Sequence, residues 1–134
     1  MKKSILRILL MTLLPVASEL SGSQSVSAVT GERVVLFSDR NLYVAGEPIL
    51  FTAFLFSDEE VTEPLMSRVL YCELLTPEGN RIAGNKFLIE NSRASGSINL
   101  PGDLITGTYF LRAYTRYMRN YGPYAYDYTA IKVI

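Results

Sequence analysis

The chain has 134 residues, with 13 Lys and Arg, 13 Asp and Glu, a single Cys and no His. This length fits one domain that buries its own core without covalent staples. The charge is balanced and no Lys/Arg cluster is present, which argues against nucleic acid and against an anionic membrane surface as partners, because both are bound by neutralising phosphates. One Cys excludes an intrachain disulfide.

The first 28 residues are typical of a secretory signal peptide. Lys2, Lys3 and Arg7 precede a short apolar run at 8–17, and Val26-Ser27-Ala28 is a small-x-small cleavage signal. The run is too short to span a bilayer, although a signal-anchor helix is the alternative. We therefore expect an exported protein, periplasmic or associated with the outer membrane or cell surface, with a signal peptide at 1–28, a mature domain at 29–134 and no membrane span after cleavage.

Seven segments have the composition of β-strands: 33–38, 49–57, 67–76, 81–90, 93–100, 107–114 and 126–134. Turn signals separate them, among them Ala45-Gly-Glu-Pro48 and Pro77-Glu-Gly-Asn80. Residues 39–48 are expected to form a loop, and a bulge is expected at 83–85. Seven short strands without helical periodicity predict an all-β, immunoglobulin-like antiparallel β-sandwich, with an open barrel as the alternative.

The segment 100–114 predicts a tyrosine corner. Gly107 is expected to permit the bend, and Tyr109 would fill the core while its hydroxyl bonds to backbone a few residues upstream. On the strand that follows, Tyr109, Leu111 and Ala113 would face one side, and Phe110, Arg112 and Tyr114 the other.

Two stretches are candidate contact surfaces. The strand at 49–57 is apolar on both faces, so Leu50, Phe54 and Phe56 on its outer face are expected to be covered by a loop, another domain or a partner. The connection 116–126 holds four Tyr and two Arg, residue types that dominate protein-contact hot spots. Its candidate contact residues are Tyr117, Met118, Arg119, Tyr121 and Tyr124. A short helical turn with Tyr117 and Met118 against the core is the alternative, and the two interpretations are compatible.

No catalytic, cofactor or metal site is predicted. Cys72 lies in an apolar strand and is expected to pack as a small hydrophobe. The acidic segment 58–63 lacks the regular D-x-D-x-D-G spacing of a calcium loop and is interpreted as a solvated loop. Without His, acid–base chemistry would need paired carboxylates, and none are placed together by spacing.

Three stretches, 39–51, 69–79 and 107–114, together resemble the second macroglobulin-like (MG2) domain of the α2-macroglobulin family. The tail at 112–122 is similar to the version in exported proteins of Bacteroidetes-type bacteria. The family's protease-trapping members carry a Cys-Gly-Glu-Gln type thioester in a separate domain, whereas Cys72 here is followed by Glu73-Leu74-Leu75. The resemblance therefore implies a scaffold domain that packs against similar neighbours, and no thioester chemistry.

Two functions are consistent with these features. The first is a non-enzymatic structural and interaction module of an exported cell-envelope protein, with other protein domains or envelope proteins as partners. The alternative is a small carbohydrate- or peptide-binding module, with Tyr117, Tyr121 and Tyr124 as a stacking platform and a glycan as candidate ligand.

Overall fold

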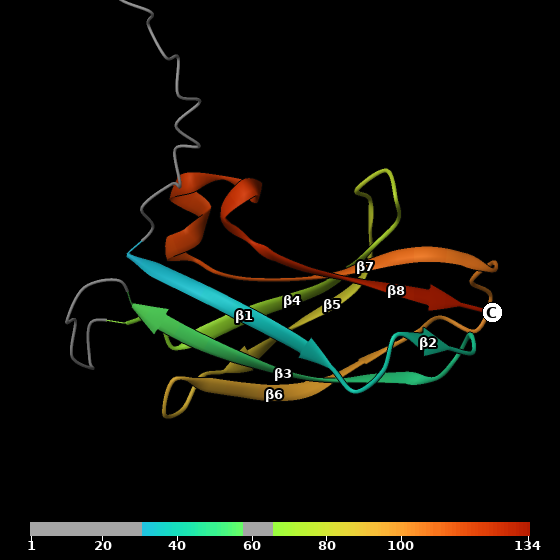
Figure 1. Cartoon of the computed structure of the whole chain (residues 1–134), viewed down its shortest axis with the longest axis horizontal. Coiled ribbons are helices and arrows are strands. Elements are labelled where there is room, and N and C mark those ends of the chain that lie inside the picture. Colours follow the sequence, from blue (N-terminus) through green and yellow to red (C-terminus); the bar gives the residue numbers. More distant parts are fainter. Residues whose placement is uncertain (1–30, 58–65) are drawn as a thin grey trace, which may run out of the picture.

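The computed structural model of the chain describes residues 31–57 and 66–134. The signal peptide predicted at 1–28 and the acidic segment at 58–63 lie outside the described residues. Within them, two β-sheets pack face to face, and two short helical turns lie at one end of the sandwich (Figure 1).

The first sheet has three antiparallel strands in the order β1-β3-β6, which are β1 (Glu32–Ser38), β3 (Pro48–Ser57) and β6 (Arg93–Asn99). The second has five strands in the order β2-β8-β7-β4-β5, which are β2 (Leu42–Tyr43), β8 (Asp127–Val133), β7 (Gly107–Thr115), β4 (Val69–Leu75) and β5 (Arg81–Leu88). All pairings are antiparallel except that of β2 with β8. The predicted immunoglobulin-like sandwich is confirmed, and the two separate sheets exclude the open barrel.

The core lies between the sheets and follows the alternation of the strands. Ile49, Phe51, Ala53 and Leu55 of β3 are buried, and their intervening neighbours face outward. Cys72 of β4 is fully buried within this core. Burial, with a smaller contribution from neighbouring Glu73, raises the pKa of the Cys72 thiol to about 12. The thiol is therefore protonated at neutral pH, as expected for a packing residue.

The tyrosine corner is present at the start of β7. Tyr109 is buried, and its hydroxyl donates a hydrogen bond of 2.9 Å to the carbonyl oxygen of Ile105. The expectation that Gly107 permits the bend is wrong. Its φ lies outside the left-handed region, and a Cβ there would meet only the Tyr109 ring at 4.0 Å, so the bend does not require a glycine.

A second buried tyrosine organises residues 39–48, which the sequence predicts to be a loop. The Tyr43 hydroxyl lies 2.6 Å from Asp39 Oδ1 and 2.7 Å from the Arg40 carbonyl oxygen. Burial of the phenol, reinforced by the Asp39 carboxylate, raises the pKa of Tyr43 to about 12. This anchor holds β2 against β8, where Tyr43 pairs with Val133.

The predicted irregularity in β5 is shifted by one residue. Leu74 pairs with Ala83 and Leu75 with Arg81, so Ile82 is the extra residue of the bulge. Gly84 has a different role, because a Cβ there would lie 2.9 Å from the Cys72 carbonyl oxygen and equally near the Glu73 side chain. Glycine thus lets β5 approach β4 closely.

A buried carboxylate ties β1, β7 and the segment before β4 together at the end that carries the helical turns. Glu32 of β1 accepts hydrogen bonds from the Ser67 backbone N–H at 2.6 Å, the Ser67 hydroxyl at 2.8 Å and the Thr115 hydroxyl at 2.8 Å. The Thr115 hydroxyl in turn accepts from the Met118 N–H. Both Glu32 and Thr115 are buried, so this network fixes the connection from β7 into the turns.

We predict that Tyr109→Phe lowers the free energy of unfolding by about 1 kcal/mol, because the ring still fills the core while the bond to Ile105 is lost. Urea denaturation measures the change. Tyr124→Phe is the matched control, since Tyr124 is fully exposed. Equal values for both variants and the parent chain would show that the corner bond does not contribute.

We predict that Gly96→Ala destabilises the sandwich by about 1–3 kcal/mol through overpacking. A Cβ at Gly96 would clash with the ring of Phe87, which itself packs edge-on against Phe51 with centroids 4.7 Å apart. Gly102→Ala is the control, because its Cβ would meet no atom within 4 Å. Equal denaturation midpoints for the two variants would contradict the prediction.

Candidate interaction surfaces

The outer face of the three-stranded sheet carries a cluster of exposed large apolar side chains. Phe37 of β1 and Leu50, Phe54 and Phe56 of β3 are 56%, 52%, 37% and 44% exposed. We call these four residues the apolar sheet face. Outward positions of a solvated sheet are normally polar, so the cluster departs from the usual alternation.

The strand register makes these side chains neighbours. Phe37 lies opposite Thr52 in the β1–β3 pair, and its ring packs edge-on against Phe54 with centroids 6.0 Å apart. The Arg33 guanidinium, on the same face of β1, lies 5.3 Å from the ring centroid of Phe56. The predicted outward orientation of Leu50, Phe54 and Phe56 is therefore observed, and Phe37 extends the surface onto β1.

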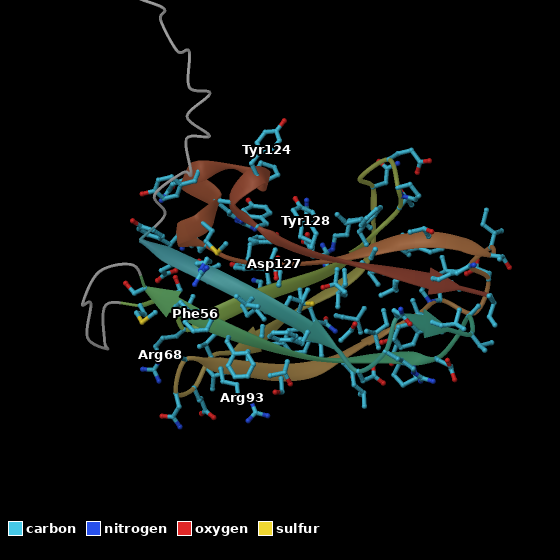
Figure 2. The ribbon with its side chains drawn as sticks, in the orientation of Figure 1. Phe56, Arg68, Arg93, Tyr124, Asp127 and Tyr128 are labelled. Atoms are coloured by element: carbon cyan, nitrogen blue, oxygen red, sulfur yellow. The ribbon has the colours of Figure 1, made fainter. Side chains whose placement is uncertain are left out.

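Strand β6 borders the apolar sheet face with polar groups. Arg93 pairs with Phe54, Ser95 with Thr52 and Ser97 with Leu50, and these three β6 residues are exposed. Figure 2 shows Phe56 and Arg93 in the layer of β3 and β6, on the far side of the sandwich from Tyr124. An apolar centre with a polar, cationic border is typical of a protein contact surface.

The connection after β7 forms two 3-10 turns, η1 (Tyr117–Tyr121) and η2 (Pro123–Ala125). Met118 is fully buried in the core, and its N–H donates to the Thr115 hydroxyl. Its assignment as a contact residue was therefore wrong, and the helical-turn alternative describes it correctly. The reason is that the Glu32–Thr115 network turns Met118 inward directly after β7.

The tyrosines of this connection do not form one platform. Tyr117 and Tyr121 are partly exposed neighbours, with hydroxyl oxygens 3.1 Å apart and rings tilted by 49°. Tyr124 is fully exposed and projects away from the turns (Figure 2). Among the ring pairs of the described residues, Tyr124 has no stacking partner.

Arg119 instead reaches the outer face of the five-stranded sheet. Its guanidinium lies 4.7 Å from the ring centroid of Tyr71 and 5.5 Å from that of Tyr114. Tyr71, Tyr114 and Tyr126 form a continuous stack, with centroids 5.2 and 4.2 Å apart and interplanar angles of 4° and 15°. This tyrosine stack joins β4, β7 and the residue before β8, and Arg119 covers one part of it.

The tyrosine stack rests beside an ion pair with two hydrogen bonds. Arg112 of β7 donates to Glu73 Oε2 of β4 through Nε at 3.0 Å and through a terminal nitrogen at 2.6 Å. The Tyr114 hydroxyl donates to the other oxygen of Glu73 at 3.0 Å. Although burial by itself lowers the pKa of Arg112, the hydrogen bonds to Glu73 and Tyr128 outweigh it and raise that pKa.

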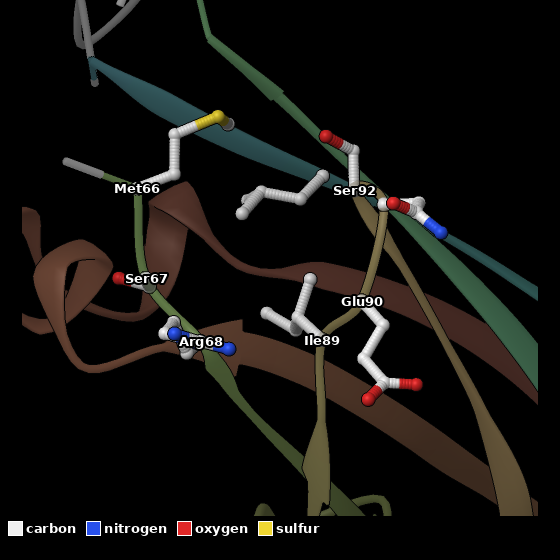
Figure 3. Close-up of a pocket in the computed structure, with 8 residues that line it drawn as sticks. Met66, Ser67, Arg68, Ile89, Glu90 and Ser92 are labelled. Atoms are coloured by element: carbon white, nitrogen blue, oxygen red, sulfur yellow. The ribbon is translucent and has the colours of Figure 1, made fainter. Parts of the chain in front are cut away.

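The described surface has two hollows, and one of them is lined by members of this cluster. A hollow of about 440 Å³ lies where β3 ends, and Leu55 is among its lining residues. Figure 3 shows Met66, Ser67, Arg68, Ile89 and Glu90 around it. Residues 58–65, which join Ser57 to Met66, lie outside the described part of the chain. Another hollow, of about 550 Å³, lies on the outer face of the five-stranded sheet and is lined by Tyr71, Glu73, Arg81, Gly84, Asn85, Lys86 and Arg119.

Within residues 31–57 and 66–134, no group of three or more His, Cys, Asp or Glu is close enough together to hold a metal ion. In the same residues, no helix has both the length and the apolar character needed to cross a bilayer.

The sequence pattern predicted Arg119 and the β3 part of the apolar sheet face as contact residues. It did not predict the cluster of residues that Arg119 contacts on the five-stranded sheet. Tyr71, Glu73, Arg112 and Tyr114 occupy outward positions of β4 and β7, and their partnership depends on the pairing of Tyr71 with Tyr114 and of Glu73 with Arg112. Alternation predicts the face on which each lies. It does not predict which strands become neighbours, so no signal in the sequence identified this cluster.

No protein-family model matches the chain, and a search of curated proteins found no significant match. Solved structures do match. A Salmonella α2-macroglobulin mutant has a TM-score of 0.60 and 21% identity over 79% of this chain. Trypsin-activated α2-macroglobulin from Escherichia coli, and the native conformation of the E. coli protein, each give a TM-score of 0.59, with 20% and 19% identity over 78% of this chain.

The chain has a macroglobulin-like β-sandwich fold, and the resemblance seen in the sequence is confirmed at the level of fold. It spans only 6–7% of the length of these α2-macroglobulin chains. Two finer points remain predictions. One is that the domain corresponds to the second macroglobulin-like (MG2) domain of that family, and the other is that it is of the Bacteroidetes type.

We predict that Glu73→Gln lowers the free energy of unfolding by about 1.5–3 kcal/mol, since the neutral amide cannot replace the charged acceptor of Arg112 and Tyr114. Thermal and urea denaturation at neutral pH measure the change. Glu78→Gln, in the exposed turn after β4, is the matched control. A Glu73→Gln variant as stable as this control would show that the ion pair adds nothing to the fold.

Proposed function

We propose that this chain is a non-enzymatic packing module of an exported cell-envelope protein, and that it docks through the apolar sheet face onto a neighbouring protein domain. The observation that carries the proposal is the exposure of Phe37, Leu50, Phe54 and Phe56 on one outer face of two paired strands. Export rests on the signal peptide predicted at 1–28, and docking agrees with the scaffold role that the family resemblance implies.

The energetics favour a contact rather than a role in folding. The inward residues of β3 already supply the core, so the outward phenyl rings contribute little to it. Removing exposed apolar area from water is favourable by about 25 cal/mol per Å², before the entropic cost of association is subtracted. A cluster of three Phe and one Leu therefore favours a partner surface that is itself apolar, with groups able to meet Arg33 and Arg93 at the border.

A carbohydrate- or peptide-binding module remains the second candidate, favoured by the full exposure of Tyr124. The separation of Tyr124 from the Tyr117–Tyr121 pair removes the three-ring platform on which that hypothesis was built. A glycan titration compares the chain with Tyr124→Ala and Tyr121→Ala, and saturable binding lost in either variant would support this alternative.

The packing proposal predicts position-specific contacts in the source cell. A photoreactive benzoylphenylalanine in place of Phe54 should cross-link to one defined site on another domain or envelope protein, identified by mass spectrometry of the joined peptides. The same group in place of Ile105, which is highly exposed in the loop before β7, is the control.

Phe54→Thr should stay folded, and its free energy of unfolding should fall by about 0.5–1.5 kcal/mol because the contact with the Phe37 ring is lost.

Envelope fractionation and an immunoblot against residues 29–134 establish whether the cross-linked site belongs to the same chain or to a separate protein. A Phe54 position that gives no cross-link, or the same scattered products as Ile105, would contradict the proposed docking surface.

A further inference from the structure

The hollow on the outer face of the five-stranded sheet is positively charged. Arg81, Lys86 and Arg119 line it, and Glu73 is the one acid among its described lining residues. The Glu73 charge is already matched by Arg112, which donates two hydrogen bonds to it. Arg81, Lys86 and Arg119 therefore give the hollow three positive charges in excess of its acidic charge. This excess contrasts with the predicted mature chain, in which Asp and Glu outnumber Lys and Arg by 12 to 10.

Two of the three cations of this hollow, Lys86 and Arg119, lie against an aromatic ring rather than against a carboxylate. The Lys86 ammonium lies 5.6 Å, and the Arg119 guanidinium 4.7 Å, from the centroid of the same Tyr71 ring. Neither Lys86 nor Arg119 forms an ion pair with a described carboxylate. Arg81 donates to the Gly84 carbonyl oxygen at 3.1 Å and lies 3.6 Å from Glu73. The hollow thus presents two cations, Lys86 and Arg119, whose anionic partner is not supplied by the described chain.

The geometry favours a small anionic group over a stacked sugar ring. Tyr71 lies parallel to Tyr114 at 5.2 Å, and the Lys86 and Arg119 cations lie against Tyr71 as well. Its ring is therefore engaged within the domain, whereas sugar stacking requires an open aromatic face. The Arg119 guanidinium can pair with a carboxylate in bidentate fashion.

The hollow is also accessible to an extended segment. Strand β5, which carries Arg81, Asn85 and Lys86, is an end strand of the sheet order β2-β8-β7-β4-β5. A segment lying along β5 would place acidic side chains against Lys86 and Arg119 without displacing a strand.

We propose that this hollow binds Asp or Glu side chains of an acidic segment on a neighbouring protein domain. The proposal rests on the packing function above and names the chemistry of a second contact. This contact lies on the opposite outer face from the apolar sheet face, because β4 and β5 belong to the other sheet.

An oligo-glutamate peptide with a fluorescent label is the test probe, and its binding to the full mature chain is measured by anisotropy at low and high salt. We expect saturable binding that weakens as salt screens the exposed charges. Lys86→Gln should weaken it about fivefold, and Lys86→Gln with Arg119→Gln more than tenfold. Lys132→Gln removes the same charge from exposed β8 in the same sheet and should leave binding unchanged.

Circular dichroism confirms that each variant is folded, and Lys86→Gln alone leaves the Arg119 contacts in place. An absence of saturable binding, or an equal loss in Lys132→Gln, would overturn the proposal. Tighter binding of an oligo-glucuronate than of oligo-glutamate would overturn the protein partner in favour of an acidic glycan. Because the probe contacts β4, β5 and η1, a negative result leaves the Phe54 cross-linking experiment on β3 unaffected.

Discussion

The pairing of β4 with β7 is the contact on which both sides of the five-stranded sheet depend. On the inner side it places Cys72 opposite Ala113 and Leu74 opposite Leu111, all of them fully buried. On the outer side the same register places Glu73 beside Arg112 and Tyr71 beside Tyr114. One register therefore fixes the core and the polar cluster together, and a slip by one residue would exchange the two faces.

The outer faces of the two sheets differ in the kind of interaction that their side chains make. The five-stranded sheet covers the middle of its outer face with groups of its own, because Glu73, Arg112 and Tyr114 of the tyrosine stack satisfy one another. The three-stranded sheet leaves its Phe and Leu side chains in water. Buried, satisfied polar groups specify a structure, whereas exposed apolar groups gain free energy only when something covers them.

The sequence predicts well what depends on alternation and turn chemistry. The seven longer strands, the corner at Tyr109 and the outward direction of Phe54 all follow from period two and from local turn residues. What it does not predict depends on neighbours distant in the chain. Tyr43 is buried because Asp39 and β8 enclose it, and Met118 is buried because Thr115 and Glu32 hold the turn that precedes it.

The tyrosine-rich connection at 116–126 shows why composition alone does not predict a contact surface. Its residues were grouped because they are adjacent in sequence, but successive positions of a 3-10 turn point about 120° apart. Tyr117, Met118 and Arg119 accordingly point in three directions. Tyr117 lies beside Tyr121, Met118 enters the core and Arg119 crosses to Tyr71 on the sheet. The turn therefore distributes its side chains among three environments. Arg119 lies near the Lys86 charge because the pairing of β4 with β5 places Lys86 beside Tyr71, the ring that Arg119 contacts. The cationic hollow therefore depends on the sheet register and not on the loop alone.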